Sequence, residues 1–201
     1  MALSIFAMMI VLLMFGFPMM IPLIAAAFVG FFVLFGGFGQ LETMVQQILA
    51  GIRPASLIAV PMFIFAADIM TRGQSAGRLI DMVMTFVGHV RGGLAVSTAA
   101  ACTMFGAVSG STQATVVAVG TPLRPRMLKA GYKDSFVLAL IVNSSDIAFL
   151  IPPSIGMIIY GVVANTSIAG LFMAGFIPGF VLTTLLCLTS YVIARKRGYV
   201  G

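Results

Sequence analysis

No charged residue precedes Glu42 in this chain, and the long stretch before it is almost entirely apolar. Across all 201 residues only 8% are charged, 61% are hydrophobic, and the mean hydropathy is +1.16. The apolar runs are continuous rather than alternating, which favours membrane-spanning helices over a β-barrel. The sequence therefore predicts an all-α polytopic membrane protein.

The first apolar run is too long for a single crossing. Roughly 40 residues of helix would extend about 60 Å, twice the thickness of a hydrocarbon core. Gly16-Phe-Pro18 contains residues that interrupt helices, so we expect two spans, over residues 3–15 and 19–38. Residues 40–53 place apolar side chains at helical spacing between polar ones. That pattern predicts an amphipathic helix at the membrane interface.

Positive charge at both ends of residues 94–123 identifies a candidate re-entrant hairpin. Arg91 precedes this apolar segment, and Arg124, Arg126 and Lys129 follow it. Basic residues favour the cytoplasmic side, so both ends are expected on that side. The middle, Ala107-Val-Ser-Gly-Ser-Thr-Gln113, then lies at membrane depth. Irregular backbone there needs protein or a water-filled cavity around it, as at the binding sites of transporters.

The remaining segments complete the predicted order of elements. A third span over 55–70 precedes a second interfacial helix over 71–93. After the hairpin and a polar loop over 124–135 we expect a discontinuous helix over 136–164, with breaks at Asn143–Asp146 and Pro152-Pro153. A last span over 168–194 follows. The predicted segments are an N-terminal helix pair with an interfacial arm (1–54), the third span with its interfacial helix (55–93), the hairpin with its basic loop (94–135), and the discontinuous helix with the final span (136–201).

The charge distribution supports about five crossings in addition to the hairpin. With the N-terminus outside, ten of the eleven basic residues lie on the cytoplasmic side, and only Arg53 does not. The Gly201 end is then cytoplasmic. An odd number of crossings would insert a following copy upside down, as inverted-repeat transporters require. We therefore expect one half of such a transporter, or a truncated product of one.

Several motifs occur in the order and spacing of one known family: Gly88-His-Val-Arg-Gly-Gly93, Phe105-Gly-Ala-Val-Ser-Gly-Ser111, Lys129-Ala-Gly-Tyr132, Ile151-Pro-Pro-Ser-Ile155, Tyr160-Gly161 and Leu171-Phe-Met-Ala-Gly-Phe-Ile-Pro-Gly179. With them the chain resembles the N-terminal half of the large membrane subunit of tripartite ATP-independent periplasmic (TRAP) transporters. It departs from the family at Thr115, where many members have an aspartate. It departs again at Asp146 and Ala148, where they often have a threonine and a glycine.

The resemblance implies a sodium-driven secondary transporter with an elevator-type motion in the bacterial inner membrane, its N-terminus periplasmic. It implies organic-acid substrates, such as dicarboxylates or sialic acids, delivered by a periplasmic binding protein. A small membrane subunit would pack beside the large one. No cofactor is expected apart from sodium as the coupling ion.

Under this interpretation the two polar breaks form the candidate sodium site. Sodium is a hard cation that takes oxygen ligands, and an unwound helix frees carbonyl oxygens beside its hydroxyls. We expect the two breaks to meet near the bilayer midplane. The predicted sodium ligands are Ser109, Gly110, Ser111, Asn143, Ser144, Ser145 and Asp146.

A carboxylate substrate needs the opposite polarity. The half-helix that begins near Gln113 presents free backbone N–H groups, which favour an anion, and nearby hydroxyls add donors. The predicted substrate contacts are Ser111, Thr112, Gln113 and Thr115.

Other interpretations remain open. Small residues in membrane helices also serve close helix packing. Asp146 is also compatible with a capping role, and Asp68, near a helix end, suits an interfacial or salt-bridged role.

Alternative functions are a binding-protein-independent anion symporter of inverted-repeat type and a non-transporting membrane scaffold. The sequence has no paired-carboxylate or His-rich membrane motif, which argues against an enzyme and predicts no catalytic residues. Basic residues spread among short loops argue against nucleic-acid binding.

Overall fold

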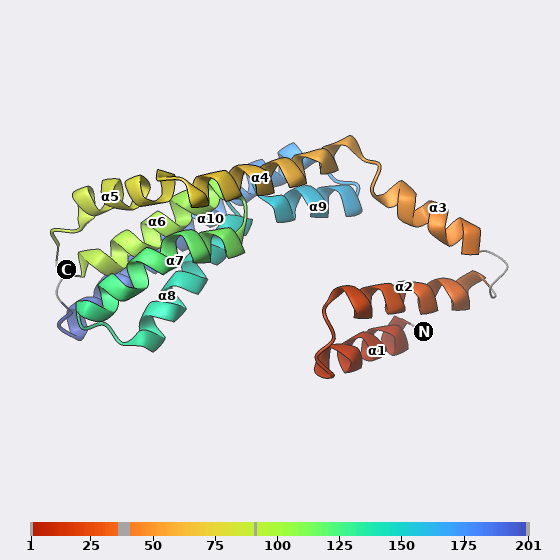
Figure 1. Ribbon diagram of the computed structural model, residues 1–201, viewed down its shortest axis with the longest axis horizontal. Helices are drawn as coiled ribbons and strands as arrows, with labels where there is room; N and C mark the ends of the chain where they lie inside the picture. The colour runs from red at the N-terminus through yellow and green to blue at the C-terminus, as the bar shows by residue number, and fades with distance from the viewer. Residues whose placement is uncertain (1, 36–40, 91, 200–201) are drawn as a thin grey trace. The chain divides into compact units, whose positions relative to one another are not determined.

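The computed structural model describes residues 2–35, 41–90 and 92–199, and these divide into two compact units, Met1–Pro54 and Ala55–Gly201 (Figure 1). The described residues form α-helices, short 3₁₀ helices and turns, with no strand among them. The all-α prediction is confirmed.

The first unit contains a pair of apolar helices and one amphipathic helix. Helices α1 (Ala2–Met14) and α2 (Met20–Phe35) pack against each other, and the turn between them includes Gly16 at φ +80°. The predicted break is therefore confirmed, although the last residues of the predicted span, 36–38, lie outside the described residues. Helix α3 (Leu41–Gly51) matches the predicted amphipathic helix. Its place at a membrane interface stays a prediction.

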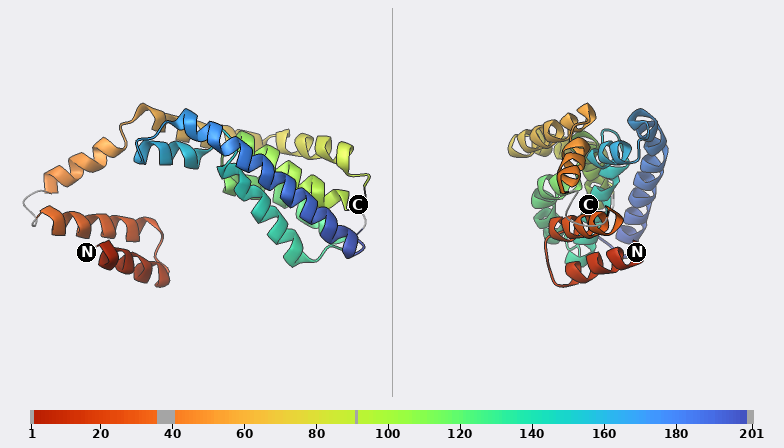
Figure 2. Two further views of the ribbon diagram at one scale, coloured as in Figure 1. Left: turned by 180° about the vertical axis from the view of Figure 1, so that it is seen from behind. Right: turned by 90° about the vertical axis from the view of Figure 1, so that its right-hand side faces the viewer.

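The second unit is built around helix α6 (Gly93–Ser109), which contacts most of the other helices of the unit (Figures 1 and 2). Its remaining elements are η2 (Ala55–Ile58), α4 (Ala59–Arg72), α5 (Ser75–Val87), α7 (Thr112–Lys129), α8 (Asp134–Asp146), η3 (Ile147–Phe149), α9 (Ile155–Val163) and α10 (Ile168–Lys196). By length and composition, two described helical segments could each cross a membrane: Ala55–Arg72 and Ile168–Lys196. The number of crossings stays a prediction.

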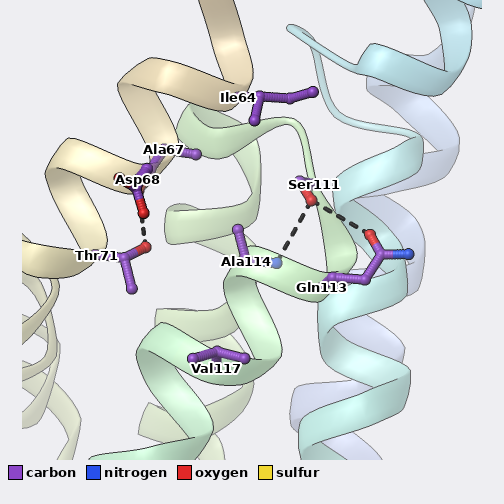
Figure 3. Close-up of a pocket in the computed structure, with 8 residues that line it drawn as sticks. All are labelled: Ile64, Ala67, Asp68, Thr71, Ser111, Gln113, Ala114 and Val117. Atoms are coloured by element: carbon purple, nitrogen blue, oxygen red, sulfur yellow. Dashed lines mark hydrogen bonds between the residues drawn. The ribbon is translucent and has the colours of Figure 1, made fainter. Parts of the chain in front are cut away.

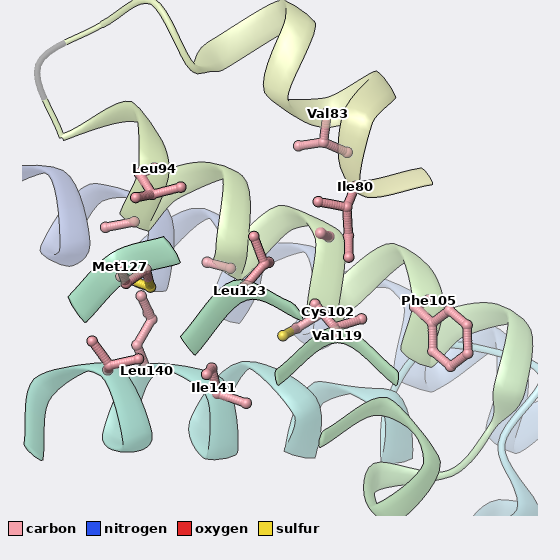
Figure 4. Close-up of a cluster of buried hydrophobic side chains, with 14 of the residues drawn as sticks. Ile80, Val83, Leu94, Cys102, Phe105, Val119, Leu123, Met127, Leu140 and Ile141 are labelled. Atoms are coloured by element: carbon pink, nitrogen blue, oxygen red, sulfur yellow. The ribbon is translucent and has the colours of Figure 1, made fainter. Parts of the chain in front are cut away.

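Small side chains allow α6 to sit at the centre. Ala95, Ala99 and Cys102 are completely or almost completely buried, and small residues let helix backbones approach closely. Larger side chains from the surrounding helices fill the space between them (Figure 4). They include Ile80 of α5, Leu123 of α7 and Ile141 of α8. Cys102 is a free, buried thiol and packs as a small side chain among them.

The predicted hairpin is present as two helices joined by a two-residue tip, and its re-entrant path in the membrane stays a prediction. Helices α6 and α7 lie side by side, and the start of α6 and the end of α7 lie at the same end of the unit (Figures 1 and 2). Helix α7 runs on to Lys129, through Pro122 and Pro125. The expected polar loop over 124–135 is therefore too long, because burial of Leu123 and Met127 in the core outweighs the helix-breaking tendency of the two prolines.

After the hairpin tip, the chain has its second break at Pro152-Pro153, as predicted, whereas the break predicted at Asn143–Asp146 is wrong. Asn143–Asp146 form the last turn of α8, and the chain leaves helical geometry only over residues 150–154, after the short η3. The Asn143 side chain donates to the carbonyl oxygen of Ala139 at 2.7 Å, so this polar residue is accommodated within the helix. Pro152 and Pro153 lack the N–H groups needed to continue a helix.

Helix α5 lies within the second interfacial helix predicted over 71–93. Its apolar residues Ile80 and Val83 are buried in the core cluster, whereas Met82 and Phe86 are exposed. One part of its apolar surface therefore serves packing within the unit. Placement at a membrane surface stays a prediction for the exposed part.

Gly106 provides a test of the close packing of α6. A Cβ atom added there would lie 2.7 Å from the Cβ of Ala148, whereas one added at Gly77 of α5 would have open space. We expect Gly106→Ala to destabilise the protein by roughly 1–3 kcal/mol through overpacking. Gly77→Ala should be neutral or stabilise it by about 0.5–1 kcal/mol. Thermal unfolding of the complete subunit in detergent compares them, and equal midpoints would contradict the packing described.

An ion pair joins the ends of α7 and α8 next to the predicted cytoplasmic loop. The guanidinium of Arg124 donates twice to the Asp134 carboxylate, at 2.9 Å each, and this holds the Asp134 pKa below its ordinary value of 3.8. A lowered carboxyl pKa stabilises the folded state above the unfolded pKa, and this contribution is lost as the pH falls through the folded pKa.

We therefore expect Asp134→Asn to lower the thermal midpoint slightly at pH 7, and the difference from the unchanged protein to vanish below the lowered pKa. Thermal unfolding across a pH series measures this. Arg126→Gln removes only a longer contact to Asp81, at 3.7 Å, and serves as the control. A difference that persists at the acidic end of the series would argue against this assignment.

Candidate functional site

The hairpin tip follows directly from its sequence. Helix α6 ends at Ser109, and Gly110 takes the left-handed conformation, φ +62° and ψ 12°, that favours glycine. Ser111 is extended and caps α7, its hydroxyl accepting from the Ala114 backbone N–H at 3.4 Å. The Gly-Ser pair therefore ends one helix and starts the next within two residues.

A hydrogen-bonded link inside the tip holds the two legs together. The Thr115 hydroxyl donates to the backbone carbonyl of Ser111 at 2.8 Å and lies 3.2 Å from the hydroxyl of Ser109. Both side chains are buried. Thr115, which stands where many family members have an aspartate, thus serves the geometry of the tip. Its predicted contact with substrate stays a prediction.

The tip packs against the second break through backbone atoms. The Ile155 N–H donates to the Gly110 carbonyl at 3.3 Å, and a Cβ atom on Gly110 would come within 2.8 Å of the Pro153 carbonyl oxygen. One turn earlier, Gly106 faces Ala148 of η3. The two breaks are therefore in contact, and the residues that make the contact are 148–155 rather than the side chains of Asn143–Asp146.

The predicted sodium ligands of α8 divide into two pairs. Ser144 and Ser145 are completely buried, and neither hydroxyl has a hydrogen-bond partner among the described residues. The Ser145 hydroxyl lies beside the Cys102 thiol. Asn143 and Asp146 are exposed on the other side of the turn. The described contacts do not join these four residues to Ser109, Gly110 and Ser111 in one coordination shell, so the sodium site stays a prediction.

A cavity of about 320 Å³ opens between α4 and the start of α7 (Figure 3). Its volume falls at the lower end of the range for small-molecule pockets, about 300–1,000 Å³. The walls are apolar at Ile64, Ala67, Ala114 and Val117, and the polar groups are Asp68, Thr71, Ser111 and Gln113. Of the predicted substrate contacts, Ser111 and Gln113 line this cavity, whereas Thr112 and Thr115 do not.

Sequence reasoning did not connect Asp68 with this cavity. It predicted an interfacial or salt-bridged role, and the salt bridge is present: the Arg72 guanidinium lies 2.9 Å from the Asp68 carboxylate, one helical turn away. The available signal was helical spacing, because Ile64, Asp68 and Thr71 share one face of α4.

Among the described residues no cluster of three or more His, Cys, Asp or Glu side chains is suited to a metal ion. A metal site there would need hydroxyl and carbonyl oxygens.

Comparison with known proteins decides the family. Residues 6–201 match the family described as "Tripartite ATP-independent periplasmic transporter, DctM component". The chain belongs to this family. Its members are permeases of the inner membrane and not enzymes, so the resemblance seen in the motifs is confirmed.

Three relatives show how the chain compares within the family. It is 78% identical over 197 residues to the ectoine/5-hydroxyectoine TRAP transporter large permease protein of Ruegeria pomeroyi, and 71% identical over 192 residues to the ectoine TRAP transporter large permease protein of Halomonas elongata. It is 37% identical over 188 residues to the sialic acid TRAP transporter large permease protein of Vibrio cholerae. These matches cover 98%, 96% and 94% of the chain and 46%, 45% and 44% of the relatives. The chain therefore spans about half their length.

Substitution of Gly110 tests the tip geometry. Gly110→Ala would incur the left-handed penalty, roughly 1–2 kcal/mol, together with a clash against Pro153. Gly131 has φ +85° but open space around it, so Gly131→Ala carries only the first cost. We expect Gly110→Ala to lower the thermal midpoint clearly more than Gly131→Ala does. Equal shifts would show that the tip does not pack tightly against the second break.

Proposed function

We propose that the complete subunit carries out sodium-coupled uptake of a small zwitterionic carboxylate of the ectoine type. A periplasmic binding protein would deliver the substrate, and a small membrane subunit would pack beside the large one. The transport step would be of the elevator type, in the bacterial inner membrane, with the N-terminus periplasmic and the Gly201 end cytoplasmic.

The relatives favour ectoine over the dicarboxylates and sialic acids expected from the motifs. The two relatives named for ectoine are 71–78% identical to the chain, whereas those named for C4-dicarboxylates or sialic acid are 36–42% identical. Ectoine carries a carboxylate and a ring amidinium cation, so it retains the acidic group on which the earlier expectation rested. The proposal therefore narrows the substrate class from organic acids to a zwitterion.

The observation that carries the proposal is the start of α7 beside the cavity. A helix N-terminus presents unpaired N–H groups and a positive partial charge, which favour an anion. Ser111 and Gln113 place a hydroxyl and an amide at the cavity wall. The carboxylate of the substrate would bind at this end of the cavity, and the apolar walls would contact its ring.

The sodium proposal rests on Ser144 and Ser145. A buried hydroxyl without a partner costs free energy, and such a group in a native protein calls for a ligand or water. Both hydroxyls lie in the last turn of α8, and helical geometry continues through η3 before it ends over residues 150–154. Two neighbouring, buried oxygen donors suit a sodium ion, which is a hard cation.

Uptake into proteoliposomes tests this function. The complete large subunit and its small partner would be reconstituted, and binding protein loaded with labelled ectoine added outside, under a sodium or a potassium gradient. We expect uptake that requires both sodium and the binding protein. Uptake without the binding protein would instead favour the other class of symporter. No uptake of ectoine under a sodium gradient would count against the proposal.

The double change Ser144→Ala and Ser145→Ala tests the ion site. It should raise the sodium concentration for half-maximal uptake at least tenfold, because two oxygen donors are lost. Ser97→Ala is the matched control, since Ser97 of α6 is also buried with an unpartnered hydroxyl. An equal sodium dependence in both variants would remove Ser144 and Ser145 from the site.

A further inference from the structure

The cavity between α4 and α7 has polar groups of two kinds on opposite walls. Figure 3 shows Asp68 and Thr71 on the α4 side and Ser111 and Gln113 on the α7 side, with apolar side chains between them. The α7 wall favours negative charge because a helix begins there. The α4 wall carries a carboxylate, which favours positive charge. An occupant with opposite charges at its two ends fits both walls at once.

We propose that Asp68 binds the cationic part of the substrate and sets the selectivity of the permease for zwitterions. The proposal rests on the proposed function, because it assigns a second contact to the substrate whose carboxylate lies at the start of α7. Asp68 is a specificity-determining residue in this assignment. It attracts an amidinium ring and repels the second carboxylate of a dicarboxylic acid.

The ion pair with Arg72 does not account for Asp68 by itself. The Asp68 side chain remains 53% exposed and that of Arg72 80% exposed, and an exposed pair of this kind contributes little to stability. Thr71, the other polar residue of this wall, turns its hydroxyl to the Ala67 carbonyl at 2.7 Å, so Asp68 supplies the charged acceptor there. Arg72 does not line the cavity. With about half of its side chain exposed, the Asp68 carboxylate can also meet a cation that enters the cavity.

Repulsion is as important as attraction for this role. Specificity is a difference between affinities, and an unpaired like charge against the wrong ligand widens that difference. A dicarboxylate placed with one carboxylate at the start of α7 would direct its second carboxylate toward Asp68. A zwitterion in the same position would direct its cation there.

The test compares four variants of the complete large subunit, purified with its small partner. They are Asp68→Asn, Asp68→Glu, Arg72→Gln and Asp81→Asn. Asp81 is a matched control, because it is an exposed carboxylate of α5 paired with Arg126 and lies outside the cavity. Ligand affinity would be measured by the thermal stabilisation of each complex with ectoine or with succinate, in sodium, and uptake by proteoliposomes with one preparation of ectoine-loaded binding protein.

We expect Asp68→Asn to weaken ectoine binding and lower kcat/KM roughly ten- to hundredfold, as for loss of a charge-assisted hydrogen bond. The ratio of its affinity for ectoine to its affinity for succinate should fall by at least the same factor. Asp68→Glu should retain part of the preference, and Arg72→Gln and Asp81→Asn should behave like the unchanged protein. Because affinity is measured per folded complex, lower expression of Asp68→Asn does not obscure the result.

Three outcomes separate this inference from the function on which it rests. If the unchanged protein takes up ectoine and Asp68→Asn keeps the same affinity and preference, the assignment of Asp68 is overturned and the proposed function stands. If Arg72→Gln loses as much as Asp68→Asn, the pair is structural and the inference is also overturned. If the unchanged protein neither binds nor transports ectoine, the proposed function fails.

Discussion

The close approach of helices to α6 is the constraint on which the second unit depends. Alanines, a cysteine and Gly106 along α6 allow the neighbouring helices to approach it closely, and larger side chains from those helices fill the space between them. Membrane helices associate through such packing, because lipid is as apolar as the side chains it would replace. The irregular tip at Gly110 and Ser111 is possible only within this arrangement. Its carbonyl and hydroxyl groups find partners at Ile155, Ala114 and Thr115 because α6 and α7 hold them in place.

Much of this architecture could be predicted from local sequence. Gly16-Phe-Pro18 marked the turn between α1 and α2, and Gly110-Ser111 marked the hairpin tip, because glycine permits the left-handed conformation and serine caps a helix. The basic residues on both sides of residues 94–123 led to the hairpin through topology alone. These signals act locally or through charge, so they can be read without knowledge of the packed structure.

The errors occur where tertiary packing decides. The polar residues over 124–135 suggested a loop, but burial of Leu123 and Met127 carries α7 on to Lys129, past Pro122 and Pro125. Asn143–Asp146 suggested an unwound segment, yet the Asn143 side chain bonds within the helix, and the break follows it. The cavity beside Asp68 could not be predicted, because it depends on how α4 lies against α7. The arrangement of the helices determines which polar residues line a pocket, and local propensity does not determine that arrangement.

The two helix ends near the tip have opposite polarity. Helix α7 begins there with a positive partial charge, and the helical run of α8 and η3 ends just before residues 150–154 with a negative one. The tip is bonded to the chain that follows η3 through the Gly110 carbonyl and the Ile155 N–H. Under the proposed function, an anion at the first end and a sodium ion at the second would act on backbone segments that contact each other. Each ligand would then favour the tip geometry that the other requires, and such coupling is necessarily reciprocal. Under the proposed function, the ordered conformation of Gly110 would therefore contribute to the coupling as well as to the fold.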